Sequence, residues 1–238
     1  MGSISGSKKL KRQMAPQFWG ITRKNKRFVV NVRPGPHKKE QSIPTAVFLR
    51  DMLSIVTTLR EAKTTIYSGK VKIDGVVRKS LHHAIGLMDV IELENVPEIY
   101  RLVPKDKKLL QPVVIDKADK SLKLARVSSK TTISGGKTQI GLHDGRSIIT
   151  DADANIGDSC LLKVPEQEIL KIIKLEAGCQ ALVTRGVNAG QVGMIESIEE
   201  GTFILPRRVV LRLGERSIEI PSDIIILVGR EEPLIKIK

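Results

Sequence analysis

The spacing of apolar residues just after position 41 is helical. In "SIPTAVFLRDMLSIV" (residues 42–56) they recur at roughly helical intervals after Pro44, which suits a first helical turn. A second helical stretch follows, opened by Thr58 and Glu61, which have the spacing of a capping box. The pattern therefore predicts one short helix and then a second at about residues 59–68.

The second helix is predicted to have one face that packs and another that is free to bind. Gly69 can adopt the left-handed conformation that ends it. At 100° per residue, the apolar and basic positions fall on faces about a quarter-turn apart. The packing face holds Leu59, Ala62 and Ile66, and the basic face holds Arg60, Lys63 and Tyr67.

After Gly69 the spacing changes to that of a β-hairpin. "KVKI" and "VVRK" flank Asp74-Gly75, a strong signal for a two-residue turn. A further strand, "DVIEL", would complete a small sheet. The hairpin is expected to bring four basic residues close to the basic helix face: Lys70, Lys72, Arg78 and Lys79.

The rest of the chain is predicted to be mostly strand. Short β-rich runs such as "QPVVI", "KLARV" and "QIGLHDGRSIIT" are separated by Gly, Asp and Lys turns. "KVPEQEILKIIKLEAG" is interpreted as a strand-rich connection, and "FILPRRVVLRL", "RSIEI" and "DIIILVG" supply further strands near the end. No repeat of 20 to 50 residues is evident. The fold class expected from these patterns is α+β.

Lysine and arginine are concentrated at the N-terminal end. The 238-residue chain has a formal net charge of +14; residues 1–39 carry eleven Lys or Arg and no Asp or Glu, whereas residues 175–238 carry eight basic and nine acidic residues. Because residues 1–41 also lack a steady apolar period, they are predicted to form an extended basic arm that orders only against a partner. Such an arm indicates a polyanion, with nucleic acid favoured over an anionic membrane.

Composition narrows the partner and the compartment. No apolar run is long enough to span a membrane, and no secretory signal follows the first charges, so the protein is expected to be cytoplasmic. With 3% aromatic residues, recognition should depend on phosphate, sugar and RNA shape rather than on base stacking. Trp19 is expected to pin the arm onto the protein's own surface, with stacking on a base as the alternative.

Two motifs resemble catalytic sites only in part. "SGGKT" at residues 134–138 ends like a phosphate loop, but Thr131 occupies the position of its first glycine. His143-Asp144 has no accompanying nucleophile, so a turn before Gly145 explains the pair better. Catalytic residues and small-molecule substrates are therefore not expected.

The residues that could bind metal are also isolated. His82-His83 has no nearby acidic or Cys/His cluster and is interpreted as a solvated or RNA-facing pair. Cys160 and Cys179 lack partners for zinc or a disulfide framework and are predicted to be core residues. Neither a metal nor a cofactor is expected.

The helix pair and hairpin resemble the S-four-type RNA-binding domain. The order helix, "REAK", helix, "SGKVKIDGVV" and "GLMDVIEL" is similar to that module, whose hairpin has the form Gly-x-Val-x-Val-Asn-Gly. The matching positions are Gly69, Val71, Ile73, Asp74 and Gly75.

The surrounding sequence resembles the small-subunit ribosomal protein family S-four-e of archaea and eukaryotes. "APQFW", "RPGPHKK", "IPTAVFLRDML" and "GLMDVI" occur in the family's order. "GCQALVTRGVNAGQVGMIESIEEG" (178–201) resembles a KOW motif, with Gly186, Gly190 and Gly193 in a barrel turn.

The resemblance implies a domain order and a function. It divides the chain into a basic RNA-binding arm (1–41), an S-four-type RNA-binding domain (42–95), a central β domain (96–174) and an SH3-like KOW β-barrel (175–238). It implies a structural, non-enzymatic constituent of the cytoplasmic ribosome. The implied partners are small-subunit ribosomal RNA, mainly its 5′ domain, and neighbouring small-subunit proteins.

The residues expected to contact RNA are basic and lie in the first two of these domains. Those in the arm are Lys8, Lys9, Lys11, Arg12, Arg23, Lys24, Lys26, Arg27, Lys38 and Lys39. Those in the S-four-type domain are Arg50, Arg60, Lys63, Lys70, Lys72, Arg78 and Lys79.

Two other classes of protein stay open. An RNA-modifying enzyme could carry an S-four-type domain for targeting, but residues 95–238 show neither a nucleophile setting nor a cofactor loop. A KOW-type transcription or translation factor is the other alternative. The long basic arm counts against it, because a factor that cycles gains little from a permanently neutralised extension.

Overall fold

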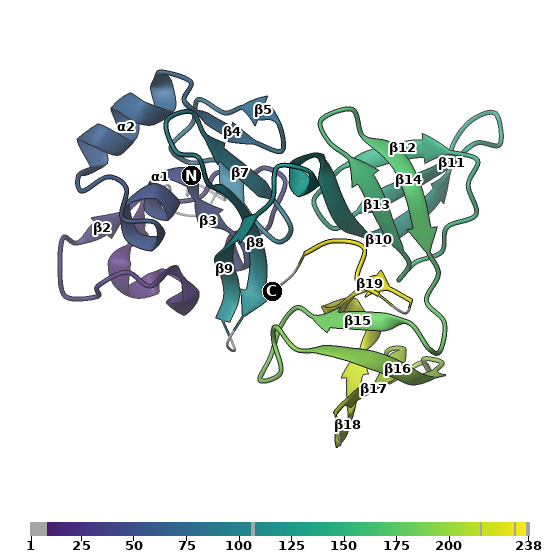
Figure 1. The fold of residues 1–238 in the computed structure, drawn as a ribbon. Helices are drawn as coiled ribbons and strands as arrows, with labels where there is room; N and C mark the ends of the chain where they lie inside the picture. Colours follow the sequence, from purple (N-terminus) through teal and green to yellow (C-terminus); the bar gives the residue numbers. More distant parts are fainter. Residues whose placement is uncertain (1–8, 106–107, 215, 231, 237–238) are drawn as a thin grey trace, which may run out of the picture.

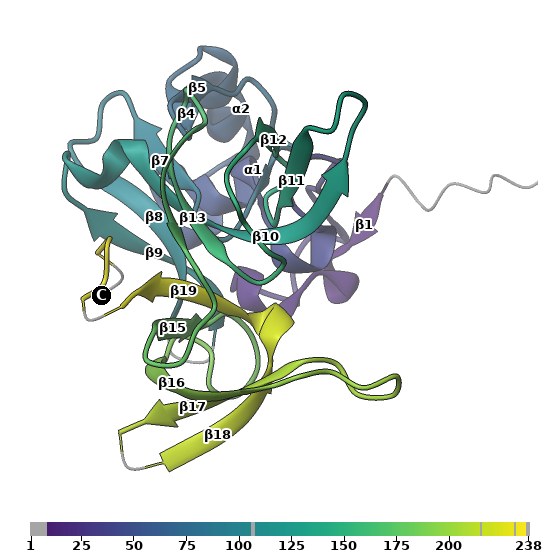
Figure 2. The ribbon, with the colours of Figure 1, turned by 90° about the vertical axis from the view of Figure 1, so that its right-hand side faces the viewer.

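The computed structural model describes residues 9–105, 108–214, 216–230 and 232–236. Over these residues the chain is mostly strand, in three five-stranded antiparallel sheets with a few short helices on the first (Figure 1). Figure 2 shows the same arrangement from the side, with a long loop between β16 and β17 extending away from the body. No helix among the described residues is both long and apolar enough to cross a membrane.

The first sheet has the strand order β5-β4-β7-β8-β9. Its strands are β4 (Val71–Ile73), β5 (Val76–Val77), β7 (Val90–Leu93), β8 (Ile99–Lys105) and β9 (Lys108–Ile115). The predicted S-four-type domain was expected to end at residue 95, but β7 pairs with β8, placing Val90 opposite Arg101, and β8 pairs with β9. The hydrogen-bonded ladder therefore continues across that boundary.

The second and third sheets are formed by the rest of the chain. The second has the order β12-β11-β10-β13-β14, with β10 (Leu122–Thr132), β11 (Thr138–Leu142), β12 (Ser147–Thr150), β13 (Ser159–Lys163) and β14 (Glu168–Ile173). The third has the order β18-β17-β16-β15-β19, with β15 (Gln180–Val183), β16 (Val192–Glu199), β17 (Arg208–Leu213), β18 (Arg216–Pro221) and β19 (Ile225–Gly229).

The remaining elements are short. Two-residue strands pair as β1 (Leu10–Lys11) with β2 (Phe28–Val29), and as β3 (Ile43–Pro44) with β6 (Ala84–Ile85). The helices are α1 (Thr45–Val47), which continues as a π-helical turn over Phe48–Met52, and α2 (Leu59–Tyr67). 3-10 turns lie at Arg12–Met14, Gln17–Trp19, Lys39–Gln41, Asp119–Ser121 and Ser222–Ile224.

The capping signals of the second helix are confirmed. The Glu61 N–H donates to Thr58 Oγ1 (3.2 Å), and the Glu61 carboxylate accepts from the backbone of Thr58 (3.4 Å). The Thr57 N–H also donates to this carboxylate, and these bonds lower the pKa of Glu61. Gly69 follows the helix with φ of +83°.

One position of the predicted packing face is wrong. Ala62 and Ile66 are fully buried, but Leu59 is 43% exposed. It lies in the first turn of α2, at the edge of a groove rather than over the sheet. Helical periodicity gives the side of the helix that packs, but it does not say how far along the axis the partner sheet extends.

The extended arm predicted for residues 1–41 is wrong for residues 9–41, which pack against the first sheet and its helices. Trp19 is completely buried, and its Nε1–H donates to the Ser42 carbonyl (2.9 Å). Leu10 and Val32 belong to the same core. The burial of Trp19 confirms that it pins this segment to the protein itself. Apolar residues spaced irregularly between lysines and arginines give no periodic signal, so their burial depends on long-range contacts.

Arg101 joins distant parts of the chain. Its side chain is fully buried in β8, and its guanidinium donates to the carbonyls of Asp119 (2.8 Å), Leu122 (2.7 Å) and Lys236 (3.3 Å). A second apolar core joins the second and third sheets, and the Leu227 N–H donates to Ser159 Oγ (3.0 Å) between them. The three sheets thus share buried contacts.

Candidate nucleic-acid interface

Helix α2 presents an exposed basic face. Arg60 and Lys63 are both exposed, whereas Ala62 and Ile66 on the neighbouring face are buried. Lys63 Nζ lies 5.8 Å from the centroid of the Tyr67 ring, within the range of a cation–π contact. This contact orders Lys63 while its charge still reaches solvent, so the face is prepared for an anionic partner.

Lys79 extends this basic face past the end of α2. Its Cε would lie 3.3 Å from a Cβ added at Gly69, so the side chain crosses the C-terminal end of the helix. The free carbonyls there carry partial negative charge, which favours a cation. Lys70 is half-buried beside this end.

Lys72 is not part of the same surface. Val71 and Ile73 are buried in the core that contains Ala62 and Ile66 of α2. Successive side chains of a strand point to opposite faces of the sheet, so Lys72 points away from α2. The prediction that Lys72 lies close to the basic face of Arg60 is therefore wrong: the two residues are near in sequence, but their side chains lie on different faces.

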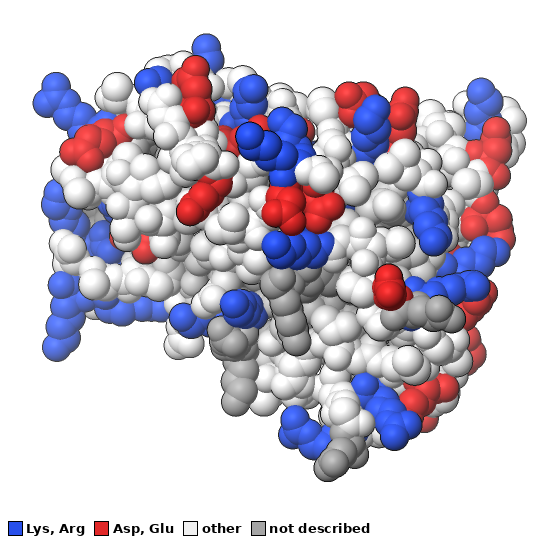
Figure 3. Space-filling view, viewed as in Figure 1, with Lys and Arg blue, Asp and Glu red and all other residues white. Residues whose placement is uncertain are grey.

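The loop before β2 brings a second set of cations next to α2. A groove of about 570 Å³ lies between them, with Lys26 and Phe28 on one side and Thr58 and Leu59 on the other. In Figure 3, Lys and Arg side chains gather along the left margin, over this loop and over α2. The cations of the loop before β2 and those of α2 are about thirty positions apart in the sequence. In the structure they lie together and form one basic margin.

The predicted RNA-contacting residues differ in how free their charges are. Lys8 lies outside the described residues. Arg12 is buried and donates to the carbonyls of Thr22 (3.1 Å) and Lys26 (2.9 Å). Its guanidinium is thus occupied in folding its own segment, and the prediction that it is a free RNA contact is wrong.

Two other predicted arginines are partly engaged within the protein. Arg23 donates to the Gln13 carbonyl (2.7 Å), and Arg50 pairs with Asp51 (2.6 Å). Lys9 and Arg27 lie 5.7 and 5.4 Å from the Phe28 ring centroid. Among the remaining predicted cations, Lys39 and Lys70 are half-buried. The others are exposed: Lys11, Lys24, Lys26, Lys38, Arg60, Lys63, Lys72, Arg78 and Lys79.

A buried cluster of charges lies between the first and second sheets, and sequence reasoning missed it. Lys123 of β10 is only 1% exposed, and its Nζ lies 2.7 Å from Asp74, 2.5 Å from Asp89 and 3.1 Å from Asp144. Arg146 also pairs with Asp74 (2.6 Å), and His37 hydrogen-bonds Asp89 (3.0 Å). These six residues hold together the hairpin turn, the N-terminal segment and the second sheet.

The pKa shifts of Asp89 and Lys123 favour the ionised form of both residues. Burial opposes the charged form of Asp89, but His37 and Lys123 outweigh burial and hold the pKa of Asp89 far below its ordinary value. The three carboxylates likewise overcome burial and raise the pKa of Lys123. Asp89 and Lys123 are therefore both ionised, and the ion pairs of the cluster fix the turn at Asp74, where φ is 50°.

The candidate catalytic and metal motifs are placed in structural positions. "SGGKT" lies in the turn between β10 and β11, a strand–turn–strand setting that no phosphate loop has. Burial lowers the pKa of His143 to about 4, so its ring is neutral. His82 Nδ1 contacts the Asn31 carbonyl (2.7 Å). Over the ranges that the structure describes, no group of three or more His, Cys, Asp or Glu is arranged to hold a metal. Cys160 and Cys179 are buried and free, as predicted.

The three glycines singled out near the C-terminal end have two different roles. Gly186 and Gly190 lie between β15 and β16 at φ of +93° and +87°. A Cβ at Gly190 would also meet the backbone of Lys105 and Pro104 at 2.8 Å, so this turn packs closely on the end of β8. Gly193 lies within β16, where a Cβ would meet the Arg212 carbonyl at 2.7 Å. It serves close strand packing and is not a turn residue.

Two family descriptions match the chain. "Ribosomal family S4e" matches residues 96–169, and "RS4NT (NUC023) domain" matches residues 5–40. Residues 9–40 of the second match belong to the segment that was expected to be an extended arm and that packs on the first sheet.

Relatives match over the whole length. "Small ribosomal subunit protein eS4" of Ignicoccus hospitalis is 38% identical, with 100% of this chain and 98% of the relative covered. The protein of the same name from Korarchaeum cryptofilum is 37% identical, with both chains fully covered. A solved structure, the 30S ribosomal protein S4e from Thermoplasma acidophilum, superposes with a TM-score of 0.69 at 34% identity, covering 81% of this chain and 97% of that one.

Proposed function

Because the chain belongs to the S4e family of ribosomal proteins, we propose that it is a structural constituent of the small ribosomal subunit that binds the subunit's RNA. The observation that carries this function is the match to small-subunit relatives along the entire chain, at 38% identity in one case. The proposed location is the cytoplasmic ribosome, and the proposed role is structural rather than catalytic. The partners are small-subunit RNA and neighbouring small-subunit proteins.

The structure supports RNA as the partner through its exposed cations. Arg60, Lys63 and Lys79 lie around one ordered helix, and the loop at residues 23–27 adds four more cations beside it. Ordered cations match the fixed phosphate spacing of a folded RNA without a large ordering cost. We propose the 5′ domain of the RNA as the target, as the family resemblance implies.

The finer architecture is also a proposal. The helices and hairpin would form the S-four-type RNA-binding unit, which β8 and β9 extend, and the third sheet would be the KOW-type SH3-like barrel. The glycine turn between β15 and β16, with both φ values positive, supports the KOW assignment. The packed segment at residues 9–41 would contribute a preformed surface rather than a thread between RNA segments.

Sedimentation of cell extract tests the function itself. The protein is expected to sediment with the small subunit through a high-salt wash, because a structural constituent neutralises many phosphates at once and is held in place by folded RNA. A transcription or translation factor, or an RNA-modifying enzyme, is expected to be released by the wash. Release at moderate salt would therefore contradict the proposal.

The α2 face is expected to select folded RNA. Substituting Arg60→Ala together with Lys63→Ala should weaken binding to a folded 5′-domain fragment more than to an unstructured RNA of equal length. Losing two phosphate contacts should also lower the slope of log affinity against log salt by roughly 1.4 to 1.8. Filter binding across a salt series measures both effects.

Lys117→Ala with Lys171→Ala is the matched control for that experiment. Both lysines are exposed, one in the connection after β9 and the other in β14, and their removal changes the net charge by the same amount. An equal loss of affinity in the two double variants would show that α2 is only one more patch of positive charge.

A further inference from the structure

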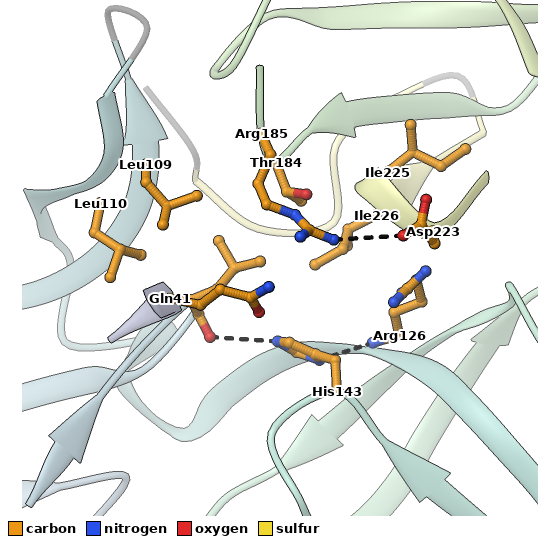
Figure 4. A pocket seen from close by; sticks show the side chains of 11 residues that line it. Gln41, Leu109, Leu110, Arg126, His143, Thr184, Arg185, Asp223, Ile225 and Ile226 are labelled. Atoms are coloured by element: carbon orange, nitrogen blue, oxygen red, sulfur yellow. Dashed lines mark hydrogen bonds and ion pairs between the residues drawn. The ribbon is translucent and has the colours of Figure 1, made fainter. Parts of the chain in front are cut away.

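A basic groove lies where the N-terminal segment meets the second and third sheets. It has a volume of about 800 Å³. Arg33, Lys38 and Lys39 line it from the N-terminal segment, Arg126 from β10, and Arg185 and Asp223 from the third sheet. Figure 4 shows the smaller pocket that adjoins this groove, where the Arg185 side chain reaches toward Asp223 and Arg126 lies close by. The groove is separate from α2 and its hairpin, none of whose residues line it.

The cations of this groove are only partly neutralised. Among the residues that the structure describes, five Lys or Arg side chains and one Asp line it. Arg185 Nη2 is 3.5 Å from Asp223 Oδ2, and Arg126 Nη1 is 3.4 Å from the Ser222 carbonyl. Both contacts are at the long limit of a hydrogen bond and leave most guanidinium donors open. Burial lowers the pKa of Arg126; Asp223 opposes this shift and the nearby Arg185 adds to it, so an incoming anion would stabilise the buried guanidinium and reduce its repulsion by Arg185.

His143 places Arg126 without adding charge. Its Nδ1 accepts from the Arg126 N–H (3.1 Å), so its Nε2–H is the atom that donates to the Leu87 carbonyl (3.4 Å). These two bonds fix one neutral tautomer, in agreement with the lowered pKa. The groove wall at Arg126 is therefore rigid.

The size of the cavity decides which part of an RNA it takes. Beyond the two arginines the space narrows to about 50 Å³, walled by Leu109, Leu110, Ile225 and Ile226. That volume holds a few waters at most, so no base can enter. The outer groove is about sixteen times larger, and its lining of five cations suits a sugar-phosphate backbone.

We propose that this groove is a second RNA-binding site, which holds the phosphate backbone of a strand that does not contact α2. Arg126 and Arg185 would take phosphate oxygens through their planar donor forks, and Lys38 and Lys39 would neutralise phosphates further along. An RNA strand carries one negative charge per nucleotide, so it can pair with several cations along the groove. An acidic protein side chain carries only one carboxylate and can pair with fewer of them. The inference rests on the proposed function.

A charge-removing double variant tests the groove. In the full chain, Arg126→Gln with Arg185→Gln should lower the salt slope of binding to small-subunit RNA by roughly 1.4 to 1.8. Lys137→Gln with Lys171→Gln is the control, since both lysines are exposed and neither lines the groove. Circular dichroism and thermal melting establish that each variant is folded. If the groove variant has the same salt slope of RNA binding as the control variant, the inference about the groove is wrong. RNA binding by the wild-type protein would still support the proposed function in that case.

A tethered probe gives a readout that does not depend on affinity. Ser128 is exposed and lines the groove, so Ser128→Cys can be labelled with an iron chelate that cleaves nearby RNA. The native cysteines stay unlabelled because both are buried, and burial raises the pKa of the Cys160 thiol to about 11. Cleavage at one defined strand is expected; no cleavage by labelled, RNA-bound protein would contradict the proposal. Polyglutamate serves as a probe for the alternative partner, an acidic protein segment. If Arg126→Gln with Arg185→Gln abolishes polyglutamate binding and leaves RNA binding unchanged, the groove would be assigned to that partner instead.

Discussion

Substituting Lys123→Met is expected to lower the free energy of unfolding by about 3–5 kcal/mol. Methionine has a similar length but no charge, so Asp74, Asp89 and Asp144 would stay buried without the cation that they share. Neither Arg146 nor His37 can replace it, because Arg146 pairs only with Asp74 and Asp144 and His37 only with Asp89, whereas Lys123 contacts all three carboxylates. Equilibrium unfolding in urea at pH 7 measures the loss.

Lys120→Met is the matched control for this substitution. Lys120 lies three positions away and pairs with Glu92 at 3.3 Å, but its side chain is exposed, so its loss should cost about 1 kcal/mol or less.

The pH dependence of stability gives a second check on Lys123→Met. The pKa values of Asp89 and Asp144 are lowered by folding, so their stabilisation is present above the ordinary value of 3.8 and is lost as the pH falls below it. The deficit of Lys123→Met should therefore shrink toward pH 3; a deficit independent of pH would mean that lost packing, not charge, is the cause.

Substituting Trp19→Ala is expected to cost about 3–5 kcal/mol, the range for removing a fully buried large aromatic side chain. It would also leave the Ser42 carbonyl without the Nε1–H donor. Urea unfolding followed by circular dichroism measures the loss. In the wild type, the fluorescence of Trp19 should shift to longer wavelength in the same transition, because it is the one tryptophan of the chain.

Phe203→Ala is the matched control for Trp19→Ala. Phe203 is 106% exposed in the long loop between β16 and β17, and its removal should change stability by less than about 0.5 kcal/mol. Equal small effects at both positions would mean that residues 9–41 do not pack on the body. If Trp19→Ala lowers the free energy of unfolding by this much, deletion of residues 1–39 is expected to unfold the first sheet. Such a deletion then cannot measure what these residues add to RNA affinity.

The sequence predicted the elements whose signals are local. The capping box at Thr58 and Glu61, the end of α2 at Gly69 and the turn at Asp74-Gly75 each depend on residues within a few positions. Such short-range chemistry is nearly independent of the rest of the fold. The burial of Ala62 and Ile66 follows from the same periodicity.

Features that depend on distant contacts could not be predicted in this way. Lys123 stands in "SLKLARV", where a strand pattern makes it one more outward lysine, and only its contact with Asp74, 49 positions earlier, shows that it is buried. Arg126 is likewise a single arginine in an apolar strand, and Arg185 is a single arginine in the loop after β15, so the basic groove has no sequence signature. The arm was misjudged for the same reason, since the partner of Trp19 is the carbonyl of Ser42, 23 positions later.

The buried charge cluster also sets an order of events during synthesis of the chain. Asp74 and Asp89 are made 49 and 34 residues before Lys123, and Asp74 precedes Arg146 by 72. At roughly 5–20 residues per second, Asp74 waits about 2–10 s for its lysine. Until then neither Lys123 nor Arg146 is available to pair with the Asp74 carboxylate, so burying the hairpin turn early would cost several kcal/mol. The nascent first sheet is therefore expected to stay open at this edge until β10 has been made, and its closure marks the moment when the two sheets fold as one unit.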